Sequence, residues 1–297
     1  MLYDKTCLTY WFPKIKEAGL PVPKTVILML SEEEKHDAYS LLDGETPQIL
    51  LDFIYRIKEA ISLVGGLPCF LRTGQTSAKH SWDGTCYVEY DDADYLLSHI
   101  GQLIEFSCIA DIRGLDFTIW AVREFLPIMP IGYCPKYKMM PVNREFRFFV
   151  EDEKIICRHP YWPRGAIEQG GLVLDNDQYA RLTSMSEGEK IKLDKIVSLA
   201  GKTVGGAWSV DLLETERGWY LTDMAEAHKS WHWEDCPNNK EKTMTKLNEK
   251  IKGKCKSCKK FFEELDEQGC CKASYCQAES LRLRAIKQMT EDDGQPK

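Results

Sequence analysis

Two aspartates, Asp211 and Asp223, stand on either side of a turn signal within residues 208–225, where their carboxylates could share one cation. Like charges that oppose each other directly in an antiparallel pair are destabilising. At about 4 Å and an effective dielectric of about 20, the repulsion is about 4 kcal/mol. A divalent cation removes this cost, and Mg²⁺ is typically held by one or two carboxylates together with substrate phosphates. The pair therefore indicates a Mg²⁺-nucleotide site; the alternative is an exposed hairpin with two solvated acids.

The register of this hairpin decides whether the two acids meet. Alternating apolar runs flank residues 216–218, which predicts a three-residue loop ending in a left-handed glycine. In that register Thr215 opposes Trp219, and Asp211 opposes Asp223 on the same face of the sheet. A slip of one residue would send Asp223 to the other face, so residues elsewhere must decide.

Basic residues in three further segments could contact phosphates. Arg72 stands in an apolar strand, and a buried arginine needs an anion or acceptors. The polar loop at residues 73–80 ends with Lys79, a point charge that follows small residues whose backbone N–H groups can approach phosphates. Arg147 shares one face of an alternating strand with Glu145. The alternatives are pairing of Arg72 with a carboxylate, an ordinary hairpin loop, and a solvated strand face.

A strand that stops at Pro127 could contact a nucleotide base. It ends with Glu124, Phe125 and Leu126. Such a connector can lie along the edge of an adenine, where backbone groups and Glu124 form hydrogen bonds and apolar side chains cover the ring. The alternative is an ordinary strand end.

The elements that must position these residues fall into two halves. Apolar periodicity predicts a strand at residues 26–30, a helix at 47–63 and a second strand at 69–72. The second half is mostly antiparallel, with a hairpin around residues 151–152, and it contains a helix at 193–201. This pattern predicts an α+β enzyme with two lobes facing a cleft.

In their order along the chain, these segments resemble the ATP-grasp superfamily, and more narrowly its divergent clade that includes the eukaryotic chaperone for assembly of a translation initiation factor. The resemblance covers residues 11–233, and the order and spacing of the motifs are fairly specific. It implies a two-lobed α+β fold with an ATP cleft between antiparallel sheets. It also implies transfer of the γ-phosphoryl group to a carboxylate, followed by attack of an amine on the acylphosphate.

The resemblance assigns roles to the candidate residues. Arg72 and Lys79 would hold phosphates, and residues 124–126 would line the adenine. Arg147 would steady the transferring phosphoryl group, so that Arg147 and Lys79 are the expected catalytic residues. Phosphoryl transfer depends mostly on positioning and charge neutralisation, and no nucleophilic side chain is required.

The implied metal ligands, Asp211 and Asp223, come with a departure from the family pattern. Many ATP-grasp proteins have an acid, one intervening residue and an asparagine that also binds metal, whereas here Asp223 and Met224 lead to Ala225. Ala225 cannot be a ligand. Either Glu226 substitutes from a bulged position or a second ion is held differently, so the number of Mg²⁺ ions stays open.

Two aromatic segments could form a pocket for a second substrate. Residues 159–164 and 228–233 gather Trp, Tyr and His side chains. Ser230 and Arg164 are the candidate polar contacts there. The alternative is ordinary aromatic packing.

The composition sets the broad class of protein. The chain has 297 residues, 43% of them hydrophobic, enough for one large domain or two smaller ones. Its net charge, 39 − 46 = −7, predicts no general attraction to nucleic acid. We find no signal-peptide pattern and no apolar run of membrane-spanning length, so a cytoplasmic protein with buried thiols rather than disulfides is expected.

The sequence divides into three regions. Residues 1–66 form a predicted N-terminal α/β region, residues 67–234 the nucleotide-binding and catalytic region, and residues 235–297 a tail rich in Lys and Cys. A CxxC pair with later cysteines can build a thiolate zinc site, although the second pair has a non-standard spacing. A redox or thiol tail is the alternative. The candidate zinc ligands are Cys255, Cys258, Cys270, Cys271 and Cys276.

Three functions compete on this evidence. The leading prediction is an ATP- and Mg²⁺-dependent ligase that joins a carboxylate to an amine, whose co-substrates, a metabolite, peptide or protein, the sequence does not identify. The main rival is a non-catalytic ATP-binding factor for assembly of another protein. A phosphotransferase that leaves a stable phosphorylated acceptor is the third.

Overall fold

The structure is a computed structural model that describes residues 4–44, 48–110, 114–239, 251–254 and 261–265. The chain forms two compact units, Met1–Trp231 and His232–Lys297. Described strands of the smaller unit, β11 (Ile251–Lys254) and β12 (Phe261–Leu265), form an antiparallel pair. The five cysteines predicted as zinc ligands lie outside the described residues, and that site stays a prediction.

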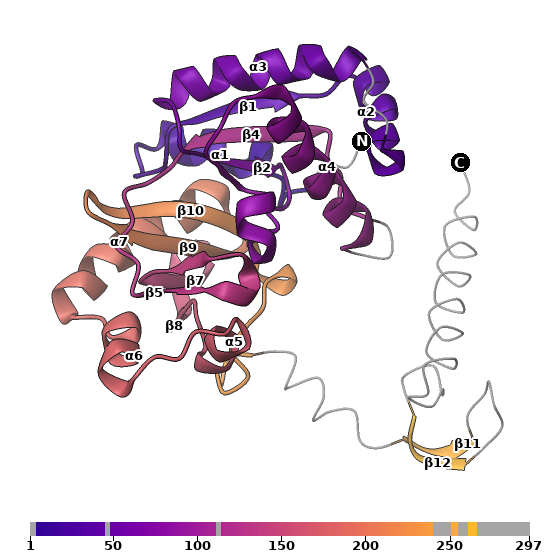
Figure 1. Ribbon diagram of the computed structural model, residues 1–297. Helices are drawn as coiled ribbons and strands as arrows, with labels where there is room; N and C mark the ends of the chain where they lie inside the picture. Colours follow the sequence, from indigo (N-terminus) through magenta and orange to yellow (C-terminus); the bar gives the residue numbers. More distant parts are fainter. Residues whose placement is uncertain (1–3, 45–47, 111–113, 240–250, 255–260, 266–297) are drawn as a thin grey trace, which may run out of the picture. The chain divides into compact units, whose positions relative to one another are not determined.

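One sheet of the larger unit has the order β1-β4-β2-β3 and is antiparallel throughout (Figure 1). Phe53 of its covering helix packs edge-on against Trp120, with ring centroids 5.7 Å apart. Leu71 and Val122 also belong to this core. Because side chains alternate along a strand, Arg72 and Arg123 point away from this covering helix. The elements are β1 (Thr25–Met29), α2 (Glu32–Ala38), η1 (Tyr39–Asp43), α3 (Gln48–Val64), β2 (Cys69–Thr73), β3 (Tyr87–Val88), α4 (Ala93–Ile109) and β4 (Ile119–Glu124).

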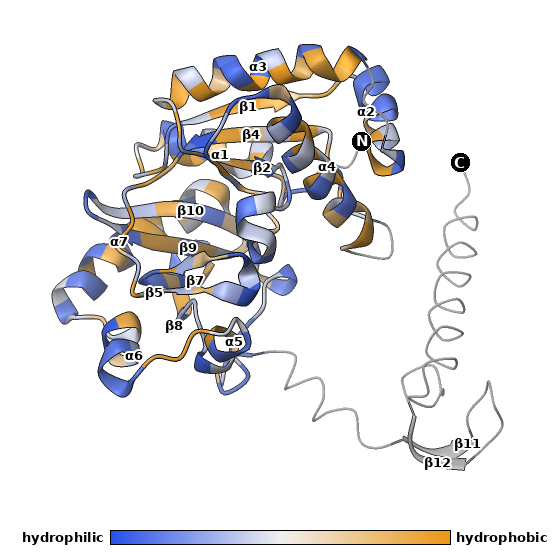
Figure 2. Ribbon diagram, in the orientation of Figure 1, coloured by the Kyte–Doolittle hydropathy of each residue, from blue (hydrophilic) through white to orange (hydrophobic). Residues whose placement is uncertain are grey.

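Helix α3 shows why one face of this sheet is buried. Its apolar residues recur at helical spacing, and Figure 2 shows hydrophilic and hydrophobic segments alternating along it. The buried side chains are Leu50, Phe53, Ile54, Ile57, Ala60, Ile61 and Val64.

The other four-stranded sheet has the order β10-β9-β7-β8 (Figure 1). Helices α1 and α7 share a core with residues of one face, including Trp208 and Phe148. Alternation therefore turns Arg147 and Asp211 to the opposite face. The elements are α1 (Leu8–Glu17), β7 (Glu145–Glu151), β8 (Lys154–Pro160), α7 (Glu187–Val204), β9 (Ala207–Thr215) and β10 (Gly218–Glu226).

Short elements complete the larger unit around a third, aromatic-rich core. Trp82, Met140 and Trp162 are among its buried residues. The elements are η2 (Lys79–Gly84), β5 (Gly132–Cys134), η3 (Pro135–Tyr137), β6 (Met140–Val142), α5 (Arg164–Gln169), α6 (Asn176–Thr183) and η4 (Ala227–Lys229).

The predicted α+β fold with antiparallel sheets is confirmed, and two local details differ. Helix α7 begins at Glu187, six residues before the predicted start at residue 193. Its N-terminus is fixed by a capping box between Ser186 and Glu189. Lys79 begins a 3₁₀ helix rather than ending a loop. Among the described helices, none combines the length and the apolar character that crossing a membrane requires.

Candidate functional site

The two aspartates oppose each other as predicted, but through a different register. The turn has two residues, since Thr215 pairs with Gly218 rather than with Trp219. This change alone would place Thr222 opposite Asp211. A β-bulge between Leu221 and Asp223 adds one residue and brings Asp223 back opposite Asp211. Two deviations from the predicted hairpin therefore cancel at the acids.

A row of charged residues crosses the sheet at this level. Arg147 of β7 pairs in register with Asp211 of β9, which pairs with Asp223 of β10. Arg147 donates two hydrogen bonds of 2.8 Å, from Nε and Nη2, to the two carboxylate oxygens of Asp211. The Asp211 carboxylate is buried. Burial alone would lower the pKa of Arg147, but the charge of Asp211 outweighs this effect, and the pKa of Arg147 is raised above its usual value. Asp211 is thus neutralised within its own sheet.

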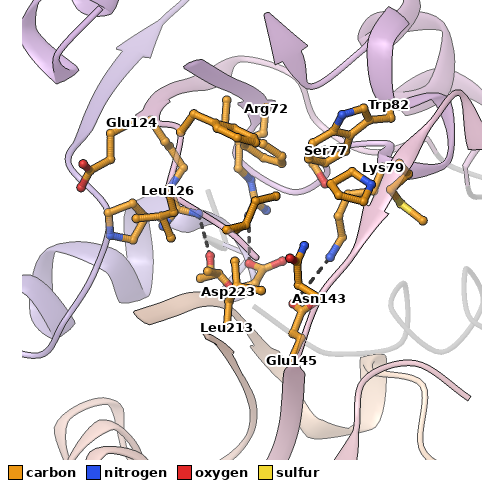
Figure 3. A pocket seen from close by; sticks show the side chains of 18 of the residues that line it. Arg72, Ser77, Lys79, Trp82, Glu124, Leu126, Asn143, Glu145, Leu213 and Asp223 are labelled. Carbon is orange, nitrogen blue, oxygen red and sulfur yellow. Dashed lines mark hydrogen bonds and ion pairs between the residues drawn. The ribbon is translucent and has the colours of Figure 1, made fainter. Parts of the chain in front are cut away.

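Asp223 is neutralised from the facing sheet. Arg72, buried at 3% exposure, donates from Nη1 to Asp223 Oδ1 at 3.0 Å (Figure 3). Burial alone would raise the pKa of Asp223, but the Arg72 guanidinium lowers it below its usual value. The Asp223 side chain remains 43% exposed. One of its faces is therefore open to a ligand while Arg72 holds the other.

Lys79 and Glu145 form a second charged pair across the cleft. Lys79 Nζ lies 3.7 Å from Glu145 Oε1 (Figure 3) and 4.3 Å from the centroid of the Tyr161 ring. Burial raises the pKa of Glu145 to about 7; Lys79 opposes this shift and Asp211 adds to it. Burial alone would lower the pKa of Lys79, but Glu145 and other nearby negative groups raise it. The Tyr161 ring also contacts Arg147, whose Cζ is 4.8 Å from its centroid.

The pocket beside these charges has apolar walls. Phe125 and Leu126 line it, as the sequence predicts for an adenine site. Glu124 also borders the pocket, but its carboxylate accepts from Lys24 N at 2.8 Å and from Arg217 Nη2 at 3.0 Å. Figure 3 shows that this carboxylate points away from Lys79 and Glu145. The remaining apolar and aromatic lining includes Phe70, Trp82, Ile128, Met140, Trp162 and Leu213.

Comparisons with known proteins give solved structures only. No protein-family model matches the chain, and no curated protein sequence matches it. Cdc123 from Schizosaccharomyces pombe, truncated at its C-terminus, aligns with 12% identity over 76% of this chain and 87% of that one, with a TM-score of 0.48. D-alanine–D-alanine ligase from Bacillus anthracis aligns with 11% identity over 74% of this chain and 54% of that one, at a TM-score of 0.40.

The ATP-grasp ligase PsnB also aligns, with 13% identity over 74% of this chain and 48% of that chain, at a TM-score of 0.38. This chain is similar to ATP-grasp structures. It spans about half the length of the ligases it matches. What the site can do must therefore come from its own residues.

The opposed carboxylates fit a hard divalent ion. Oxygen ligands from one or two carboxylates are what Mg²⁺ takes, together with phosphate oxygens. Arg147 and Arg72 now satisfy these carboxylates, and a guanidinium binds phosphate in the same forked geometry. Asp211 and Asp223 could hold the ion if Arg147 and Arg72 bound a triphosphate instead of these carboxylates.

Three other predicted contacts do not join this group. Alternation along β10 places Glu226 on the face opposite Asp223, and Glu226 pairs with Lys229 at 3.2 Å. Arg164 holds the backbone between α5 and α6, donating to Leu174 O and Asn176 Oδ1. Ser230 Oγ lies 2.5 Å from Ser209 Oγ, and Ser209 is two register positions from Asp211.

Sequence reasoning missed two buried residues of the pocket and gave no role to a third. Arg123, Asn143 and Glu145 all line it, with exposures of 3%, 6% and 6%. A usable signal existed for Glu145, which alternates onto the face of Arg147. Arg123 alternates with core residues of β4, and an arginine in such a strand needs a polar partner.

Proposed function

We propose that the cleft binds Mg-ATP and that the protein is a ligase joining a carboxylate to an amine through an acylphosphate. One observation carries the proposal: Arg72 and Lys79 face a row formed by Arg147, Asp211 and Asp223. Cations that face acids form a site in which phosphates can replace the acids as partners of the cations and a metal can replace the cations as partners of the acids.

Different residues of the cleft would bind different parts of the nucleotide. The apolar pocket with Phe125 and Leu126 would cover the adenine. Arg72 and Lys79 would take phosphate oxygens, Lys79 as a point charge and Arg72 as a fork. Asp211 and Asp223 would hold Mg²⁺, which supplies charge neutralisation for phosphoryl transfer.

Nucleotide entry would require an exchange of partners. Arg147 now occupies both oxygens of Asp211. When the triphosphate arrives, Arg147 would turn to the γ-phosphate and release the carboxylate to the cation. Neither Arg147 nor Asp211 is left unpaired before or after the exchange, which avoids the large cost of a buried single charge.

The reaction itself needs little covalent chemistry from the chain. The bond between the γ-phosphorus and the bridging oxygen breaks while a substrate carboxylate oxygen bonds to that phosphorus, and ADP leaves. The amine then bonds to the acyl carbon, phosphate leaves, and the amine loses a proton to solvent. Arg147 and Lys79 would neutralise charge on the transferring group.

Turnover tests the proposal directly. Purified protein is incubated with Mg-ATP and mixtures of amino acids or peptides, and ADP and new amide products are measured by mass spectrometry. Asp211→Asn and Lys79→Ala are expected to abolish both products. Lys202→Ala is the matched control, because Lys202 pairs with Glu153 at 3.2 Å on an exposed surface. Unchanged turnover in Asp211→Asn and Lys79→Ala would show that the assignment is wrong.

A non-catalytic ATP-binding assembly factor is the second candidate. The observation that favours it is Ala225, which follows Asp223 on the acid face and offers no ligand atom. Such a protein would gain thermal stability from Mg-ATP without forming ADP in step with a new product. The same mass-spectrometric experiment therefore separates the two candidates.

A further inference from the structure

Arg123 is a buried cation that the proposed reaction does not use. It stands on β4, in the sheet that faces the acids, and is 3% exposed. Its Nη1 crosses to the other sheet and donates to Thr222 O at 2.6 Å. Thr222 is the extra residue of the bulge that returns Asp223 to the level of Asp211. Arg123 therefore binds the irregularity on which the alignment of the acids depends.

The bulge needs such a partner because its extra residue lies outside the regular pairing of the strands. A buried backbone carbonyl left without a donor costs free energy comparable to a lost hydrogen bond. Thr222 also donates from Oγ1 to Asp211 O at 3.4 Å. Without the bulge, the two-residue turn would continue the ladder, place Thr222 opposite Asp211 and turn Asp223 to the other face.

Arg123 is itself held in one position. Its Nε donates to Thr25 Oγ1 at 3.2 Å, and its Cζ lies 5.7 Å from the centroid of the Phe12 ring. Within the described part of the chain, no carboxylate forms an ion pair with it, and Nη2 has no hydrogen-bond partner. Burial, with Arg72 nearby, lowers the pKa of Arg123 to about 9, so the group remains charged at neutral pH.

A buried cation without a carboxylate partner is costly. If Arg123 only filled space in the core, an apolar side chain would do so without this cost. We propose that Arg123 is a positioning residue for the metal-binding acids: it fixes the Thr222 bulge from the facing sheet and so keeps Asp223 in line with Asp211. The inference rests on the proposed function, because it assigns the alignment to binding of the divalent ion. It also ties the geometry of the acids to contact between the two sheets.

The test separates metal binding from nucleotide binding. Binding of Mn²⁺ in the presence of AMPPNP is measured by electron paramagnetic resonance, and binding of AMPPNP without divalent ions by calorimetry. Arg123→Met, which keeps an unbranched apolar stem but removes the donors, is expected to weaken Mn²⁺ binding about tenfold, as loss of an outer partner of metal ligands typically does. The affinity for AMPPNP without metal is expected to change less than about threefold. Arg123→Lys should restore most of the Mn²⁺ affinity.

Arg158→Met is the matched control. Arg158 stands on β8, pairs with Asp194 at 3.1 Å and contacts the Phe148 ring of the second core. This variant should bind Mn²⁺ as the wild type does.

Two results would overturn the inference while leaving the proposed function intact: unchanged Mn²⁺ affinity in Arg123→Met, or an equal loss of metal-free AMPPNP binding. A wild type that binds neither AMPPNP nor Mn²⁺ would overturn both. If Arg123→Met does not fold, the decision passes to Thr25→Val, which removes the acceptor of Nε. That variant is expected to bind Mn²⁺ about threefold more weakly, and unchanged affinity there would also overturn the inference.

Discussion

The two four-stranded sheets of the larger unit turn opposite charges toward each other. From the sheet of β2 and β4 come the guanidinium groups of Arg72 and Arg123. From the sheet of β7, β9 and β10 come the carboxylates of Glu145, Asp211 and Asp223. Each sheet is covered by helices on its other face, so its charged residues gather on the face that remains.

The difference shows how such a site can stay folded before a ligand arrives. Asp223 is paired across the gap, by Arg72, whereas Asp211 is paired within its own sheet, by Arg147. The pairing across the gap joins a buried arginine to a half-exposed acid, and the pairing within the sheet is bidentate and buried. We therefore expect substitutions of Asp211 and Arg147 to reduce stability and product formation more than substitutions on the facing sheet do.

Asp211→Asn is expected to have the largest effect. Arg147 would lose its charged partner, and breaking a buried pair lowers the free energy of unfolding by about 3 kcal/mol. Product formation is expected to fall by about 100-fold or more, because the proposed metal loses a ligand. Urea denaturation and release of ADP measure the two losses.

The control for stability is Asp194→Asn, which breaks a pair with Arg158 whose side chains are 30% and 29% exposed. That loss is expected to stay below about 1 kcal/mol. Equal destabilisation in the two variants would show that the Asp211 pair is no more protected than a surface pair.

Arg147→Met is expected to have opposite effects on metal binding and on turnover. Without nucleotide, Mn²⁺ should bind about tenfold more tightly, since Asp211 no longer has a competing cation. Product formation should fall about 30-fold, because the transferring group loses its neutralising charge. Electron paramagnetic resonance of Mn²⁺ and release of ADP provide the measurements. Weaker Mn²⁺ binding in this variant would contradict the exchange of partners.

Glu145 offers a pH test of the acidic sheet. Its pKa is raised to about 7 by burial, so between pH 4.5 and pH 7 the folded state binds more protons than the unfolded state. Stability from this group is therefore present at low pH and lost as pH rises through that window. In Glu145→Gln the difference in Tm between pH 5 and pH 8 should be smaller than in the wild type by roughly 4 °C. Glu151→Gln, at the exposed end of the same strand, should leave the difference unchanged.

Local signals in the sequence were sufficient for several elements and for two of the three residues in the charged row. Apolar alternation in β7 and β9 separates Phe148 and Val210 from Arg147 and Asp211, and the structure follows that division. The start of α7 was also encoded locally, by the capping box at Ser186. Its prediction failed because apolar periodicity alone begins later in this helix.

The bulge at Thr222 was not predicted, and the residue that holds it is not local. Leu221 and Met224 both reach the second core, although a regular ladder turns residues three apart to opposite faces, so the bulge is what lets both side chains reach that core. The bulge is stabilised by Arg123, about a hundred residues earlier in the chain, on the facing sheet. For the same reason Arg123 itself looked like an ordinary polar residue of a strand.

Substitution of Glu124 is expected to have the smallest effect. It tests whether the Glu124 carboxylate, which lies on the same sheet as Arg72 and Arg123, contacts the adenine base. Its carboxylate already accepts from Lys24 N and from Arg217, whose side chain is 47% exposed. Such a pair is worth at most about 1 kcal/mol, so Glu124→Gln should change the affinity for AMPPNP, measured by calorimetry, by less than about threefold. Arg217→Gln removes the same pair and should match it. A tenfold loss in Glu124→Gln alone would mean that the carboxylate turns to the adenine when the nucleotide binds. Cations on one sheet and acids on the other would then account for binding of the phosphates and the metal, whereas the base would be bound by an acid on the cation-bearing sheet.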